Sequence, residues 1–268
     1  MLNILYQQMG VLMMRELDEA ILVNDKKELR YLIPEPVYGH NHPDVIFYTQ
    51  YFTERAKKYG DVFANISTAF KNNRNLISAE KMAGLWSEFS RFVPSFIAKA
   101  VSLTTDPEHQ HHLIQIAYDE LGAQDKKLIH SKLFADALEK ADINPKEITP
   151  QFSVGKILSS LNESLEKIKS PSGTIGLLLS FEIIAENNIE TVFSALGIDS
   201  QREKILSDSV FFKVHRMDEV EHIRHSVANF LKFSQSEQDI KEAEEFFDVG
   251  IIFWKNFWDK IAELIVHE

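Results

Sequence analysis

Apolar residues recur every three or four positions through most of this chain, and that spacing limits its fold more than any other feature. One such stripe runs through residues 79–104 and another through 237–266. Their members are Met82, Leu85, Trp86, Phe89, Phe92, Phe96 and Ile97 in the first, and Phe246, Phe247, Trp254, Trp258, Ile261 and Ile265 in the second. A repeat of three to four residues marks one face of an α-helix, whereas a strand alternates every second residue. No alternating run is long enough to predict a sheet, so we expect an all-α protein whose aromatic stripes face the core.

Proline and glycine are scarce, with eight and ten residues in 268, and they gather where helices are expected to end. Breaks are predicted at 35–44, 142–150 and 170–173, and further helices at 126–141, 173–196 and 203–232. Another helix is predicted to begin at Pro107, because Thr105 or Asp106 before it can cap the first turn. The chain should therefore contain about eight helices.

The N-terminal stretch MLNILYQQMG is apolar at its start, but it has no basic residues there, and Gln7 and Gln8 interrupt it. These features favour an amphipathic helix over a secretion signal. No uncharged apolar run approaches the roughly 20 residues that a membrane helix needs. We expect a single all-α domain over 1–268, in which 1–75 is a helical N-terminal extension that packs on a core bundle formed by 76–268.

Charge and cysteine content exclude several classes of protein. With 29 Lys and Arg against 40 Asp and Glu, the formal net charge is −11. A nucleic-acid backbone is an unfavourable partner for such a chain, because binding to phosphates needs clustered cations. The absence of cysteine excludes disulfides, thiolate metal sites and cysteine nucleophiles, and it fits a reducing compartment. We therefore expect a cytoplasmic protein whose partner is a small-molecule substrate, not a nucleic acid or a membrane.

Histidines and carboxylates crowd the stretch FFKVHRMDEVEHIRH, residues 211–225. On a helix, His215, Glu219 and His222 fall within about 60° of one another around the axis, over two turns. Imidazole and carboxylate together suit divalent iron, and a helix holds them at a fixed separation. The stretch therefore predicts one side of a metal site. A charged face in contact with solvent is the alternative.

Further ligands must come from other helices, and two segments offer them. Glu120 and His130 would lie about 80° apart on a straight helix, so one face cannot hold both. A break near Gly122 would let two helix ends bring them together. Glu182 lies in the apolar run LLLSFEIIAEN, where an ionised carboxylate is costly without a cation. Protonation of Glu182, or a path for it to the surface, is the alternative, and Glu186 is a reserve candidate.

The order Glu–x9–His, then Glu, then His–x3–acid–x2–His resembles the haem-oxygenase-like diiron oxidases and oxygenases, also described as iron-containing redox enzymes. The resemblance extends over roughly residues 80–235, and it departs from the family pattern where Glu219 stands in place of the usual Asp. It implies a haem-oxygenase-like helical bundle, a homodimer, and two irons, Fe(II) or Fe(III), with O2 as co-substrate. The metal ligands that it implies are Glu120, His130, Glu182, His215, Glu219 and His222.

The same resemblance implies an O2-dependent oxidoreductase that acts on a small amine, an amino acid or a fatty acid. The related thiaminase-like activity is excluded, because it needs a cysteine nucleophile. The alternatives are a metal-free oxidase of the quinone-cofactor-synthase type on the same fold, and a non-catalytic helical interaction protein. Glu88 is a candidate for an additional carboxylate ligand, and His225 for a group that orients a ligand. His109, His111 and His112 are expected to be exposed at a helix start.

Overall fold

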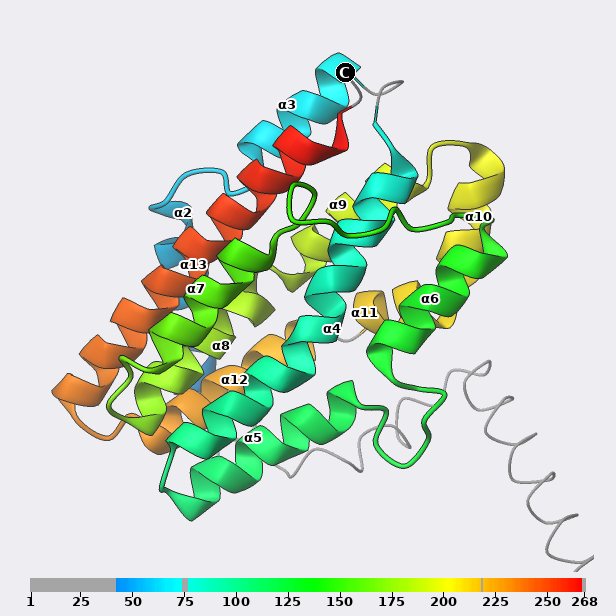
Figure 1. Ribbon diagram of the computed structural model, residues 1–268. Helices are drawn as coiled ribbons and strands as arrows, with labels where there is room; N and C mark the ends of the chain where they lie inside the picture. Colours follow the sequence, from blue (N-terminus) through cyan, green and yellow to red (C-terminus); the bar gives the residue numbers. More distant parts are fainter. Residues whose placement is uncertain (1–41, 74–76, 218, 267–268) are drawn as a thin grey trace, which may run out of the picture. The chain divides into compact units, whose positions relative to one another are not determined.

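The computed structural model describes residues 42–73, 77–217 and 219–266, and most of that part of the chain is helical (Figure 1). Its description leaves out the side chains of Lys71, Asn73, Met217 and residues 219–222. The chain divides into two compact units, Met1–Glu35 and Pro36–Glu268, and every described residue belongs to the second unit. The predicted amphipathic helix at the N-terminus lies outside the described residues. None of the described helices is both long and apolar enough to span a membrane.

Twelve helices form the described part of the chain, and it contains isolated backbone bridges but no strand. In chain order the helices are α2 (Pro43–Lys57), α3 (Ala64–Asn73), α4 (Ala79–Leu103), α5 (Pro107–Glu120), α6 (His130–Lys140), α7 (Gly155–Leu165), α8 (Pro171–Ile183), α9 (Ala185–Leu196), α10 (Ser200–Asp208), α11 (Val210–Met217), α12 (Glu219–Phe233) and α13 (Glu237–Ile265). The predicted all-α fold class is confirmed.

Side-chain caps begin the helices where the sequence predicts a start. The Asp106 carboxylate accepts a hydrogen bond from the backbone N–H of His109, and Pro107 is the first residue of α5. At α13, Ser236 and Asp239 accept hydrogen bonds from each other's backbone N–H groups. Such caps satisfy backbone N–H groups that have no partner within the helix, so they fix the residue at which each helix begins.

The aromatic stripes of α4 and α13 face each other in the core. Trp86 of α4 stacks on Trp258 of α13 with ring centroids 6.0 Å apart, and Phe89 meets Trp254 edge to face at 5.1 Å. All four side chains are buried. Each aromatic ring removes a large apolar area from water, so these contacts contribute strongly to the stability of the bundle. The prediction that both stripes form core is confirmed.

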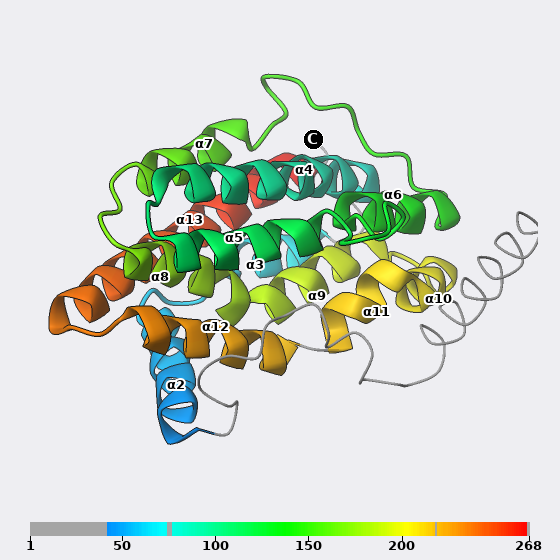
Figure 2. The same ribbon diagram turned by 90° about the horizontal axis from the view of Figure 1, so that it is seen from below.

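Glycine lets α8 lie unusually close to α13. A Cβ atom added at Gly176 would stand 2.0 Å from the carbonyl oxygen of Ala243, well inside van der Waals contact. The two backbones therefore meet at Gly176, and no larger residue fits there. Figure 2 shows that α8 also lies beside α12, while α4 lies beside α5.

Two long helices predicted from the sequence are interrupted in the structure, which partly explains why it has twelve helices and not about eight. The predicted helix 173–196 is divided into α8 and α9 at Ile184, which has φ −115° and ψ 10°. The predicted helix 203–232 is divided into α10, α11 and α12, and Ser209 has an extended backbone with ψ 150°. Neither interruption contains proline or glycine, so the usual helix-breaking signals are missing.

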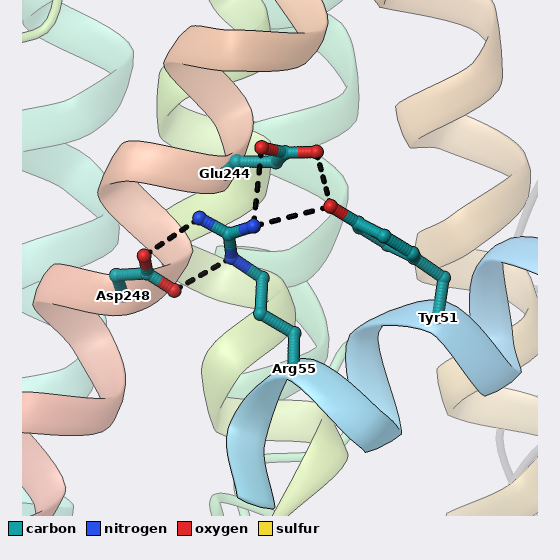
Figure 3. Close-up of polar contacts among 4 residues, drawn as sticks. All are labelled: Tyr51, Arg55, Glu244 and Asp248. Atoms are coloured by element: carbon teal, nitrogen blue, oxygen red, sulfur yellow. Dashed lines mark hydrogen bonds and ion pairs between the residues drawn. The ribbon is translucent and has the colours of Figure 1, made fainter. Parts of the chain in front are cut away.

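The predicted N-terminal extension contributes α2 and α3 to the bundle, and an ion-pair network ties α2 to α13 (Figure 3). The guanidinium of Arg55 donates two hydrogen bonds of 2.7 Å to the carboxylate of Asp248. It donates a further hydrogen bond of 3.1 Å to Glu244, which also accepts one from the hydroxyl of Tyr51. A bidentate pair between arginine and carboxylate fixes geometry as well as charge. The network therefore sets how α2 lies on the last helix.

Candidate metal centre

A tight turn between α5 and α6 brings Glu120 and His130 together. Gly122 has φ +80° and Ala123 has φ +49°, so the chain leaves the helix immediately after Glu120. A Cβ atom at Gly122 would stand 2.5 Å from the backbone nitrogen of Ile129, so only glycine fits this turn. The Glu120 Oε2 and His130 Nδ1 atoms are 3.2 Å apart. The prediction that a break near Gly122 would bring the two side chains together is confirmed.

His215 of α11 joins this pair. Its ring centroid is 5.0 Å from that of His130, and α11 packs against α6 through Phe211 and Phe134, whose ring centroids are 4.9 Å apart. The Nδ1 atom of His215 lies 2.7 Å from the carbonyl oxygen of Phe211. A carbonyl only accepts hydrogen bonds, so Nδ1 carries the hydrogen and Nε2 carries the lone pair that a metal would use. A backbone carbonyl on the second ring nitrogen is a common arrangement for histidine ligands.

The charge of Glu120 controls the protonation of His130. Burial lowers the pKa of His130, but the hydrogen bond to Glu120 and the charges of Glu120 and Asp119 raise it by more in sum. The net result is a pKa above the usual value of 6.5. Without metal the imidazole of His130 therefore keeps its second proton to a higher pH than a free histidine does. A metal ion that binds His130 must replace this proton, so metal binding at His130 releases a proton.

Glu120 also lines a cavity of about 80 Å³ between α4, α5, α8 and α12. Its wall contains the polar side chains of Glu120, Glu182, His112 and Ser226, and the apolar side chains of Val93, Phe96, Ile97, Ile116, Ile175, Leu178, Leu179 and Phe181. Glu182 is thus half-buried beside the same cavity as Glu120, whereas Glu186 is exposed. A carboxylate such as Glu182 in a mostly apolar cavity is costly to ionise unless a cation accompanies it.

The expectation that His109 and His112 are exposed at a helix start is wrong. His109 is fully buried, and neither of its ring nitrogens has a hydrogen-bond partner among the described residues. His112 lines the cavity. His111, between them, is exposed. The reason is helical spacing: His109, His112, Ile116 and Glu120 recur at three- and four-residue steps, so they share one inward face of α5. That stripe, which ends in Glu120, is the signal in the sequence that could have revealed both histidines.

Burial determines the charge of these two histidines. It lowers the pKa of His109 to about 4, against a small opposing effect of Asp106. Burial lowers the pKa of His112 to about 3, and the positive charges that His225, His109, Lys232 and His111 can carry act in the same direction. Both imidazoles are therefore neutral at pH 7.

The remaining candidates are divided between other roles and residues that the structure does not describe. Glu88 accepts hydrogen bonds from the Ser153 hydroxyl at 2.6 Å and from the Val154 backbone N–H at 2.9 Å, so it holds the start of α7 in place. The ring of His225 is 6.3 Å from that of His112. Glu219 and His222 belong to α12, but their side chains lie outside the described residues.

The donor chemistry of the assembled residues fits iron. Glu120 contacts His130, and the ring of His215 lies next to that of His130, so carboxylate oxygen and imidazole nitrogen, which are donors that iron accepts, lie near one another. Within the described part of the chain, no three His, Asp or Glu side chains converge enough to hold a metal ion by themselves.

Comparison with known proteins gives an independent view of the chain. The model of a family described as iron-containing redox enzymes matches residues 86–250, the part that contains all six predicted ligands. A crystal structure of a CADD-like protein of unknown function from Nostoc punctiforme has a TM-score of 0.66 and 15% sequence identity, and the match covers 82% of this chain and 100% of that one. A second crystal structure of that protein has a TM-score of 0.61 and 16% sequence identity, and the match covers 81% of this chain and 95% of that one. At this identity the two structures show the fold alone, and no curated protein matches the chain.

Proposed function

Because this chain belongs to the family of iron-containing redox enzymes, we propose that it is a non-haem oxidoreductase that holds two iron ions and uses O2 to oxidise a small organic substrate. Bound iron would supply the redox chemistry that amino-acid side chains lack. The residues that would hold it are Glu120, His130, Glu182, His215, Glu219 and His222.

The observation that carries the proposal is the meeting of Glu120, His130 and His215 at the junction of α5, α6 and α11. These three come from separate helices, and a turn that only glycine can form is needed to bring the first two together. Glu182 adds a second carboxylate to the cavity that Glu120 lines. A dication would compensate the charges of both carboxylates.

The chain's own residues would bind the substrate and move protons. The apolar walls of α4 and α8 exclude water and leave space for an apolar group beside Glu120 and Glu182. Among the described residues that line the cavity, none is Lys or Arg, so a free amino acid would find no cation for its carboxylate. The lining thus favours a substrate with an apolar body, such as an alkyl amine, over one whose carboxylate needs a cation from the protein. His130 can accept and release a proton at its imidazole beside the Glu120 carboxylate.

The proposal is tested by measuring iron. The protein is loaded anaerobically with Fe(II), and bound iron per chain and O2 consumption are then measured for the wild type, His215→Ala, His222→Ala and His111→Ala. We expect two irons per chain in the wild type. His111→Ala serves as the control because His111 is exposed, and it should keep both irons.

We expect less than two irons and no O2 consumption in the other two variants, because each loses a nitrogen ligand. Full iron content in both would contradict the assignment of this helix face to metal binding. A wild-type protein that binds no iron but consumes O2 would favour a metal-free oxidase of the quinone-cofactor-synthase type. A wild-type protein that neither binds iron nor consumes O2 would favour a helical interaction protein.

A further inference from the structure

Polar groups lie at two separate points along the part of α5 that borders the cavity. His112, Ile116 and Glu120 line it in sequence, so an apolar side chain separates the histidine from the carboxylate. Eight residues of helix span about 12 Å along its axis, which places His112 and Glu120 at opposite ends of this stretch. The volume of about 80 Å³ is small beside the roughly 300 to 1,000 Å³ of drug-sized sites, so it suits a short molecule.

His112 has hydrogen-bonding capacity that the described part of the protein does not use. Its nearest aromatic neighbours are the rings of His109, at 6.5 Å, and His225, at 6.3 Å, and neither contact is a hydrogen bond. Burial lowers the pKa of His112 to about 3, so at pH 7 it is a neutral imidazole with one donor and one acceptor. The neighbouring His109 is fully buried, and in the described part of the chain neither of its ring nitrogens has a partner.

Polar groups beside an apolar cavity are rarely left without partners. A ligand whose apolar end faced His112 would bury this imidazole against carbon and leave it unsatisfied, which is unfavourable. A ligand with a polar end group at His112 would satisfy it and would place apolar atoms against Ile116 and the walls of α4 and α8. The second orientation is therefore favoured.

We infer that His112 binds the polar end group of the substrate by a hydrogen bond, and that the substrate is a short amphiphile whose apolar body extends from His112 toward Glu120. This inference rests on the proposed function for the reaction at the Glu120 end, but the binding itself does not need it. Oxidation should then occur several carbons away from the polar group. A neutral imidazole can donate to a carboxylate or accept from a hydroxyl or an ammonium group, so the head group is left for experiment to distinguish.

The test is calorimetric titration of hexanoate, 1-hexanol and hexylamine into the protein, anaerobically, with and without Fe(II). The variants are His112→Leu, His112→Gln and His111→Leu, with circular dichroism to check that each is folded. His111 is the matched control because it is the adjacent histidine of α5 and is exposed. We expect at least one probe to bind the wild type and His111→Leu equally.

His112→Leu should lower the affinity for that probe roughly tenfold, which corresponds to one lost hydrogen bond. His112→Gln should restore most of the affinity, because its amide can replace that hydrogen bond. The inference is overturned if His112→Leu binds the probes as tightly as the wild type, or if the wild type binds none of them. Iron content is measured on the same samples. A wild type without iron that still binds a probe through His112 would refute the proposed function and support this inference.

Discussion

Replacing the buried His109 by phenylalanine should make the protein less sensitive to acid. His109 is fully buried against Phe233, with ring centroids 5.3 Å apart, and burial lowers its pKa to about 4. In the unfolded chain the pKa returns to about 6.5, so the unfolded state takes up a proton first as the pH falls. A histidine with a lowered pKa in the folded state therefore costs stability below pH 6.5, and the cost grows until the pH reaches about 4.

The magnitude follows from these two pKa values. Between pH 7.5 and pH 5.0 the free energy of unfolding should fall by about 2 kcal/mol because of His109 alone. His109→Phe removes this contribution, while that of His112 is present in both proteins. The assay is urea unfolding at the two pH values, and the control is the exposed His111→Phe, which should keep the wild-type pH dependence. An equal loss of stability in the wild type and in His109→Phe would refute the reasoning.

Three other substitutions give separate tests. Gly122→Ala should lower iron binding and destabilise the fold by more than about 1 kcal/mol, as measured by iron analysis and urea unfolding. The control is Gly60→Ala: Gly60 has a similar φ but nothing within 4 Å of the added Cβ, so this variant should cost only the backbone strain and keep its iron. Glu182→Gln should reduce bound iron more than Glu186→Gln in Fe(II) titrations, and the reverse order would move the ligand role to Glu186. Arg55→Met should lower the free energy of unfolding by about 2 to 3 kcal/mol, because it leaves two carboxylates of α13 without their cation; no more loss than removal of an exposed lysine of α2 would show that the network is dispensable.

Features that depend on local spacing could be predicted from the sequence. The stripes of α4 and α13 repeat at helical intervals over many residues, and burial of one face is the only way to remove so many aromatic rings from water. The pairing of Glu120 with His130 could also be predicted, because Gly122 lies between them and glycine tolerates a positive φ.

Features that depend on packing between helices could not be predicted in the same way. The end of α8 at Ile183 and the extended backbone of Ser209 carry no glycine or proline signal, so tertiary contacts decide where these helices stop. The burial of His109 and His112 depends on which side of α5 faces α8 and α12. Histidine is common both on surfaces and in interiors, so its presence near a helix start does not show whether its side chain is buried or exposed.

The ion pair between Arg55 and Asp248 joins residues that are 193 positions apart in the chain, and this has a consequence for synthesis of the protein. At about 5 to 20 residues per second, α13 leaves the ribosome roughly 10 to 40 s after α2. During that interval Phe52, on the apolar face that α2 forms with Val45 and Ala56, lacks its partners Phe230 of α12 and Phe247 of α13. The nascent chain must therefore keep this face from other chains until α13 emerges, and substitutions that make α2 more apolar should lower the yield of folded protein before they alter its stability.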